Sequence, residues 1–235
     1  MKVIAVLFSL TLSLAAQAQT LVHEYDFNGN LNDSVGNSPL VNNGGTVGAG
    51  VFSFGPNQGP SFYGASTLSS NYSIAIEFSL SSVTGFKKVI DFKNLGSDNG
   101  QYIYGGKVDF YPNSSVGSFD ANQTAELIFT RDAATKNYTA YENGSVVYTF
   151  TDSNDYGVAT IVAGGYSLFN FFIDDTLTGG RESTSGQIDL IKIWDGPISP
   201  SMATTVFTAP EPSTLALAAV GTLVGGFRLS RRNRK

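Results

Sequence analysis

The sequence predicts an all-β fold, an antiparallel β-sandwich or barrel, and three observations lead to this class. Hydrophobic residues alternate with a period of two through most of the chain, in short runs rich in Ile, Val, Tyr, Phe and Thr. Gly, Asn, Asp and Ser separate these runs, and no amphipathic helical pattern of ten residues is present. Strands without interleaved helices are typical of antiparallel sandwiches and barrels.

The alternating runs predict about ten strands. In chain order they are expected at residues 22–27, 72–80, 86–92, 101–104, 107–111, 125–131, 138–141, 145–150, 165–173 and 187–194. Asn143-Gly144 stands between two runs and predicts a type I′ hairpin turn, because both central residues of that turn need positive φ. Gly105-Gly106 precedes a strand and not a helix, so a turn is favoured there over a phosphate-binding loop.

The last expected strand ends the domain. In QIDLIKIW, alternation places Ile191 and Ile193 on one face and Trp194 on the other. Trp194 is therefore expected to be either half-exposed or covered by the segment after Ser199, where one or two helical turns are the most that the sequence predicts. No internal repeat and no linker divides residues 19–208, so we expect one domain.

The N-terminus has the pattern of a secretory signal peptide. Lys2 precedes an apolar run over residues 3–16, and Ala16 and Ala18 supply the small residues of a cleavage site. We expect signal peptidase to remove residues 1–18 and the mature chain to begin at Gln19.

The C-terminus combines a Pro-Glu-Pro step, an uncharged run over residues 213–227 and a basic end. A helix over that run would reach ~22 Å, short of a ~30 Å hydrocarbon core, although snorkelling arginines and local thinning reduce the gap. Basic residues after an apolar run hold that end on the cytoplasmic side, so a transient membrane anchor is favoured over a buried core helix. The residues concerned are Pro210, Glu211, Pro212, Arg228, Arg231 and Arg232.

In this order, the three parts of residues 209–235 resemble the PEP-CTERM sorting signal of Gram-negative bacteria. The resemblance implies recognition by an exosortase-type membrane peptidase and cleavage near the Pro-Glu-Pro step. It also implies release into the outer envelope or the extracellular space, often in bacteria that produce exopolysaccharide. Arg228 departs from the pattern, because Leu229 and Ser230 separate it from the other arginines.

Composition restricts the partners of residues 19–208. Eight basic and eighteen acidic residues remain in this range, giving a net charge near −10 that disfavours nucleic acid and anionic membrane surfaces. The chain has no Cys, which excludes disulfides, thiol catalysis and thiolate metal sites. A secreted domain without disulfides must depend on its hydrophobic core.

Two stretches carry a second resemblance. Residues 23–45 form a strand followed by an Asn- and Gly-rich loop, and residues 186–199 form a strand followed by a turn and a capping Ser. Together they are similar to the laminin-G-like or concanavalin A-like jelly roll of bacterial secreted proteins. This resemblance implies two stacked antiparallel sheets that mostly bind glycans or proteins and sometimes hydrolyse glycans.

The residues do not predict catalysis, so we expect no enzyme. Retaining jelly-roll glucanases carry E-x-D-x-E along one strand, but here Asn28 follows Glu24 and Asp26, and an amide cannot serve as the acid. His23 is the only histidine, and its place in an alternating strand favours a structural role. The other glutamates of the domain are scattered along the chain: Glu77, Glu126, Glu142 and Glu182.

Glycan binding, in particular to exopolysaccharide, is therefore the favoured function. The alternatives are a structural or adhesive matrix protein without a small ligand and, less favoured, a glycoside hydrolase. Aromatic rings pair with the C–H faces of sugars, although strand aromatics more often serve packing. The ring candidates are Tyr102, Tyr104, Tyr166 and Trp194.

A structural Ca²⁺ is expected between the first loop and the last strand, as the second resemblance implies. Ca²⁺ takes six to eight oxygen ligands, which carboxylates, amides and backbone carbonyls can supply. Asp33 and Asp189 are the main candidates, with Asp26 a weaker one; alternation puts Asp189 on the face of Ile191 and Ile193. Asp189 could instead accept hydrogen bonds from loop amides, and adjacent Asp174-Asp175 is a competing site.

Overall fold

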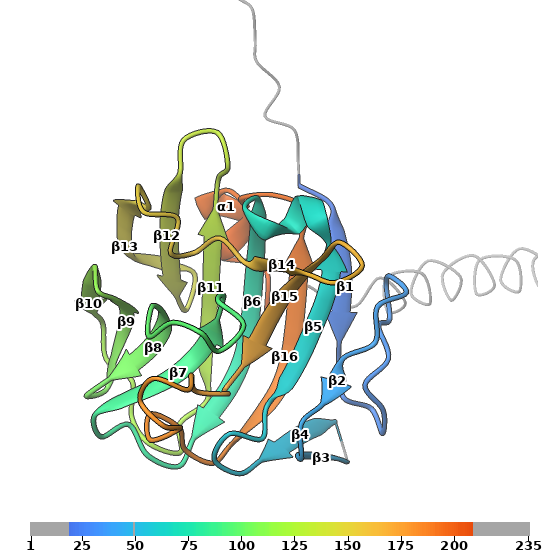
Figure 1. Ribbon diagram of the computed structural model, residues 1–235, viewed down its shortest axis with the longest axis vertical. Helices are drawn as coiled ribbons and strands as arrows, with labels where there is room; N and C mark the ends of the chain where they lie inside the picture. Colours follow the sequence, from blue (N-terminus) through green and yellow to red (C-terminus); the bar gives the residue numbers. More distant parts are fainter. Residues whose placement is uncertain (1–18, 49, 209–235) are drawn as a thin grey trace, which may run out of the picture.

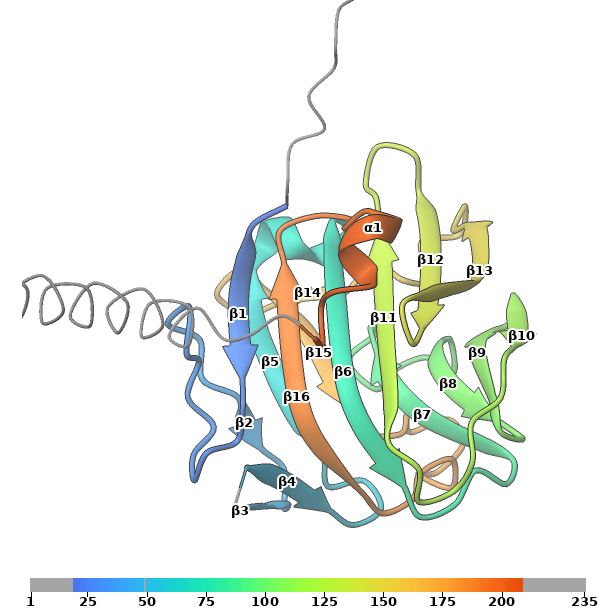
Figure 2. The ribbon, with the colours of Figure 1, turned by 180° about the vertical axis from the view of Figure 1, so that it is seen from behind.

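The computed structural model describes residues 19–48 and 50–208, and within them the chain forms two antiparallel sheets stacked as a sandwich (Figures 1 and 2). Sheet A has the order β13-β12-β11-β6-β16-β4-β3, with β1 also paired to β16. Sheet B has the order β10-β9-β8-β7-β15-β5-β2, with β14 also paired to β15. The predicted all-β class and antiparallel pairing are confirmed.

The strands of sheet A are β1 (Leu21–Tyr25), β3 (Thr46–Gly48), β4 (Val51–Phe54), β6 (Tyr72–Leu80), β11 (Ala125–Arg131), β12 (Asn137–Glu142), β13 (Ser145–Thr151) and β16 (Gly186–Trp194). The strands of sheet B are β2 (Val41–Asn42), β5 (Pro60–Ala65), β7 (Phe86–Asp91), β8 (Gly100–Tyr104), β9 (Lys107–Tyr111), β10 (Ser114–Val116), β14 (Thr160–Val162) and β15 (Tyr166–Phe171). Two short helices complete the described chain: the 3₁₀ turn η1 (Ser66–Ser69) and α1 (Pro200–Ala203).

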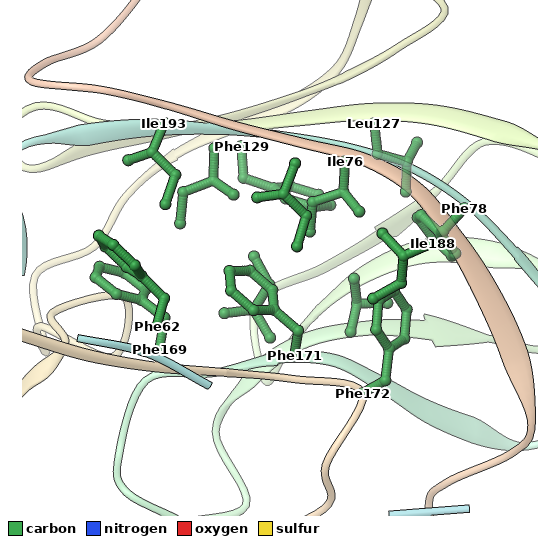
Figure 3. Packing of buried hydrophobic residues seen from close by; sticks show 14 of the residues in the cluster. Phe62, Ile76, Phe78, Leu127, Phe129, Phe169, Phe171, Phe172, Ile188 and Ile193 are labelled. Carbon is green, nitrogen blue, oxygen red and sulfur yellow. The ribbon is translucent and has the colours of Figure 1, made fainter. Parts of the chain in front are cut away.

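The core lies between the sheets and is mainly aromatic and branched aliphatic. From sheet A, one face of the alternating strands contributes Ile76, Phe78, Leu127, Phe129, Ile188 and Ile193 (Figure 3). From the sheet B side, Phe62, Phe169, Phe171 and Phe172 face them (Figure 3). Burying each such side chain contributes about 1.5–3 kcal/mol, which is how a domain without disulfides is held together.

A second, smaller cluster covers part of the outer face of sheet A. The segment that contains α1 folds back over β16 and β11 (Figure 2) and buries Trp194 with Ala75 and Ile128. Ser199 caps α1 by accepting a hydrogen bond from the Met202 N–H at 3.2 Å. Of the two alternatives for Trp194, the structure therefore shows the covered one.

The predicted turns are confirmed. Asn143 and Gly144 join β12 to β13 with φ of 50° and 75°, the two positive values that a type I′ turn requires. Gly105 and Gly106, between β8 and β9, also have positive φ, so they form a hairpin turn.

One geometric prediction was wrong. The alternation through β16 fails at Asp189, because the register with β6 shifts between Ile188 and Leu190. Ile188 and Ile191 both face the core, so this β-bulge takes Asp189 off the core face. Asp189 is half-buried beside Glu77, and burial raises the pKa of its carboxyl. A bulge changes side-chain alternation without leaving a hydrophobic signature in the sequence.

Candidate functional site

Three aromatic rings gather on the outer face of sheet B, where β7, β8 and β9 lie side by side (Figure 1). Because Ile103 and Phe110 point into the core, alternation turns Tyr104 and Tyr111 outward. Phe86 is the cross-strand partner of Tyr104, and their rings stack with centroids 4.0 Å apart. Tyr111 meets Phe86 edge-on at 5.7 Å. Tyr104 and Tyr111 are 44% and 38% exposed, so this group, the Phe86 stack, presents rings to solvent.

Two loops bring three carboxylates beside the stack. Asp98 lies in the loop between β7 and β8, while Asp175 and Glu182 lie in the connection between β15 and β16. One oxygen of each lies within 4.8 Å of the others, and we call these three residues the acidic cluster. Backbone hydrogen bonds hold the loops: Thr176 donates to Leu95 at 3.0 Å, and Lys88 donates to Glu182 at 2.8 Å.

The inner side of the acidic cluster has a counter-charge. Lys88 Nζ lies 3.0 Å from Asp175 Oδ2, and neither side chain is exposed. The same ammonium lies 4.2 Å from the centroid of the Tyr102 ring. Burial acts to raise the pKa of Asp175, but the hydrogen bond and charge of Lys88 outweigh it and hold that pKa below its ordinary value. Asp175 is therefore ionised.

The outer side of the acidic cluster has no such counter-charge among the described residues. Among the described residues, neither Asp98 nor Glu182 forms an ion pair with a basic side chain. Tyr102 Oη donates to Asp98 Oδ1 at 3.0 Å. Burial, followed by the charges of Asp98 and Asp174, raises the pKa of Glu182 to about 7. Glu182 thus exchanges a proton near neutral pH.

A pocket joins the two features. Phe86, Asp98, Tyr111 and Glu182 line a small hollow of about 80 Å³ that is open to solvent. That volume is well below the ~300–1,000 Å³ of typical drug-sized sites, so the hollow suits a substituent of a sugar whose ring lies against the exposed aromatic rings. An apolar ring wall with two carboxylates can hold a sugar by its C–H face and by its hydroxyl groups.

The aromatic residues proposed from sequence fall in different places. Tyr104 belongs to the Phe86 stack, and Tyr102 lies buried beneath it with its hydroxyl on Asp98. Tyr166 is exposed on β15, outside the residues that line the pocket. Trp194 is buried on the other sheet, so its ring is not available on the surface.

The calcium candidates are engaged by the protein itself. Asp33 Oδ1 accepts backbone hydrogen bonds from Glu24, Val35 and Gly36, and its Oδ2 lies 2.6 Å from His23 Nδ1. Asp26 accepts two bonds from Asn28. Asp189 is at the bulge of β16 described above. Within the described residues, the acidic cluster is the group of three carboxylates close enough to share a metal ion.

Asp174 and Asp175, the competing site for calcium, are not exposed to solvent. Both are buried: Asp174 Oδ2 accepts from Thr178 Oγ1 at 2.6 Å and from the Glu182 N–H at 2.8 Å. Sequence reasoning also missed Phe86, Asp98 and Lys88, and it left Glu182 among scattered glutamates. These residues come from separate loops and strands, and only the pairing of β7 with β8 and β15 brings them together.

Comparison with known proteins identifies the tail first. Residues 208–235 match the model of the PEP-CTERM protein-sorting motif. The C-terminal segment is a PEP-CTERM sorting signal. This signal marks an exported protein with a membrane-anchored C-terminus, processed by exosortase-type machinery. Among curated proteins, none matches the sequence.

Solved structures share the fold of the domain. A Trypanosoma rangeli sialidase in complex with the inhibitor DANA matches with a TM-score of 0.61 and 13% identity, covering 80% of this chain and 33% of the sialidase. Domain 4 of AbnA, a GH43 extracellular arabinanase from Geobacillus stearothermophilus, in complex with arabinotriose, matches with a TM-score of 0.52 and 19% identity, covering 80% of this chain and 98% of that domain. The chain thus spans about a third of the sialidase, and at these identities the likeness shows the fold.

These matches correct the expectation that the chain is no enzyme. The similar structures belong to a sialidase and to a GH43 arabinanase, so this fold occurs within glycosidases and an enzyme is not excluded. That expectation rested on scattered carboxylates. Distance in the sequence was a poor guide to distance in space, because Asp98 and Glu182 are 84 positions apart and yet line one pocket.

Several predicted residues lie outside the described range: Ala16, Ala18, Pro210, Glu211, Pro212, Arg228, Arg231 and Arg232. The helix expected over residues 213–227 also lies outside it. In the part of the chain that the structure describes, no helix has the length and apolar character needed to cross a membrane.

Proposed function

We propose that this exported protein binds a glycan in the pocket beside the Phe86 stack. The stacked, exposed rings next to two carboxylates without a basic partner are the observation that carries the proposal. A ring face and hydrogen-bonding carboxylates are the two kinds of group that a polyhydroxylated ring recognises. The sandwich would then be a jelly roll of the laminin-G-like or concanavalin A-like kind, displayed in the outer envelope or outside the cell and bound to exopolysaccharide.

Hydrolysis in the same pocket is a second candidate, favoured by one specific observation. Glycosidases use one protonated and one ionised carboxyl group, with the pKa of the acid raised by its surroundings. Glu182 has a pKa raised to about 7, and Asp98 lies beside it in the pocket. In that role Glu182 would donate a proton to the glycosidic oxygen, and Asp98 would act as the second carboxylate.

A polysaccharide panel tests both candidates. Affinity electrophoresis should show retardation of the exported protein in gels that contain some of the polysaccharides, and Glu182→Gln should retain the fold. Release of reducing ends by the wild type, abolished in Glu182→Gln, would support hydrolysis; retardation alone supports binding. Unretarded migration across neutral, basic and acidic polysaccharides, with no release of reducing ends, would overturn the proposed function.

The proposal also includes cleavage of the C-terminal tail and binding of a calcium ion. Exosortase cleavage near Pro210 would release the chain with a C-terminus only a few residues beyond Val206, which is packed against sheet A. A Ca²⁺ bound through Asp33 and Asp189 stays a prediction, tested below.

A further inference from the structure

The charge of the pocket carries an inference about its ligand, which rests on the proposed function. The acidic cluster has three carboxylates and a single ammonium, that of Lys88. This ammonium is bound to Asp175 on the buried side. Its remaining polar contact is with the backbone carbonyl of Asp98, at 3.3 Å.

The open side of the pocket therefore has carboxyl groups and, among the described residues that line it, no basic side chain. Asp98 and Glu182 both line it, and no basic side chain among the described residues pairs with either. Arg181, the neighbour of Glu182, directs its Nε to the Thr178 carbonyl at 2.8 Å. A carboxylate or sulfate on a ligand would face like charge here, whereas a cation would be attracted.

The inner layer shows how the site receives an ammonium group. Lys88 Nζ lies between a carboxylate, Asp175, and the face of an aromatic ring, Tyr102. The pocket lies on the outer side of this ion pair and has the same two kinds of group. These are the carboxyl groups of Asp98 and Glu182 and the rings of Phe86 and Tyr111. Among the described residues that line the pocket, none supplies an ammonium group.

We infer that the pocket selects a sugar with a free, protonated amine, an amino sugar of a cationic polysaccharide, with the ammonium on Asp98 and Glu182 and the ring against the Phe86 stack. Acidic sugars are excluded by charge, and N-acetylated sugars lose the ion pairs. A bare divalent cation fits less well, since Lys88 already holds Asp175 and would repel it.

The test compares glucosamine oligosaccharides with the same oligosaccharides after N-acetylation, and with uronic acid oligosaccharides of equal length. Calorimetric titration of the exported protein at about pH 7.5 keeps most of Glu182 ionised and leaves a large share of the amine protonated. We expect the amine form to bind about tenfold more tightly than the N-acetyl form, as for a charged hydrogen bond. Glu182→Gln and Asp98→Asn should abolish the preference. Glu126→Gln, a half-buried glutamate on sheet A, is the matched control and should retain it.

The outcomes separate this inference from the proposed function. Equal affinity for amine and N-acetyl forms, or tightest binding of the uronic acid, would overturn the inference while glycan binding stands. Binding of none of the three, together with a negative polysaccharide panel, would overturn both. If calcium chloride alone raises the melting temperature of the wild type but not that of Glu182→Gln, the acidic cluster is a metal site and the inference is wrong.

Discussion

Lys88 Nζ and Asp175 Oδ2 lie 3.0 Å apart, and both side chains are completely buried on the outer side of sheet B. The pair joins β7 to the connection between β15 and β16, which also supplies Glu182. It therefore holds one wall of the pocket in place. Two groups far apart in sequence are fixed relative to each other by one ion pair.

Lys88→Met should destabilise the protein strongly. It leaves Asp175 buried without its counter-charge, and removing one partner of a buried pair costs about 3–5 kcal/mol. The double variant Lys88→Met/Asp175→Asn should regain most of that loss. Urea denaturation of both variants measures the free energy of unfolding. A Lys88→Met variant as stable as the wild type would show that the ion pair of Lys88 with Asp175 does not hold the loop.

Stability should fall with rising pH because of Glu182. The pKa of this carboxyl rises on folding from 4.5 to about 7, so the folded state holds the proton more tightly than the unfolded chain. The stability gained in this way is complete below about pH 4.5 and is lost as the pH rises through about 7. The difference in unfolding free energy between wild type and Glu182→Gln should therefore change across this window. A difference that is constant from pH 4.5 to 8 would contradict the assignment.

The calcium proposal predicts a higher melting temperature when Ca²⁺ is added after EDTA treatment. A ligand that binds only the folded state stabilises it by mass action, roughly a kcal/mol at several-fold excess over the dissociation constant. Asp189→Ala should remove the effect if this carboxylate is a ligand. Identical wild-type melting curves with and without calcium would contradict the calcium proposal. The backbone hydrogen bonds to Asp33 would then suffice to explain the conformation of that loop.

The sorting signal predicts that exported protein lacks its tail. Intact-mass spectrometry of extracellular or envelope material should give a chain from about Gln19 to about Pro210. Substituting Pro210, Glu211 and Pro212 together by alanine should leave the unprocessed form in the inner membrane. Extracellular protein that still ends at Lys235 would contradict processing.

The sequence was sufficient for the parts of the fold that local chemistry determines. Alternation located strands such as β6 and β11, and the positive φ of Asn143 and Gly144 followed from the residue types. The short strands between residues 41 and 65 were missed. Glycines flank VFSF, and PSFYGA contains both Pro and Gly, so neither run is a strong strand signal; pairing with distant strands stabilises them instead.

The candidate site was harder to predict because it depends on long-range pairing. Tyr104 was proposed as a ring, but its stacking partner Phe86 follows from the register of β7 with β8. Asp98 and Glu182 meet only because two loops lie together over sheet B. No local pattern in the sequence indicates such a meeting.

The central claim is that the Phe86 stack and its carboxylates form a glycan site. Tyr104→Ala tests it most directly, because this ring is 44% exposed and its removal should leave the core intact. The matched control is Tyr63→Ala, a tyrosine of β5 that is 37% exposed and belongs neither to the Phe86 stack nor to the residues that line the pocket. For the tightest-binding glycan of the panel, calorimetric titration should show about a tenfold or greater loss of affinity in Tyr104→Ala, with Tyr63→Ala equal to the wild type. Unchanged affinity in Tyr104→Ala, or an equal loss in both variants, would contradict the account.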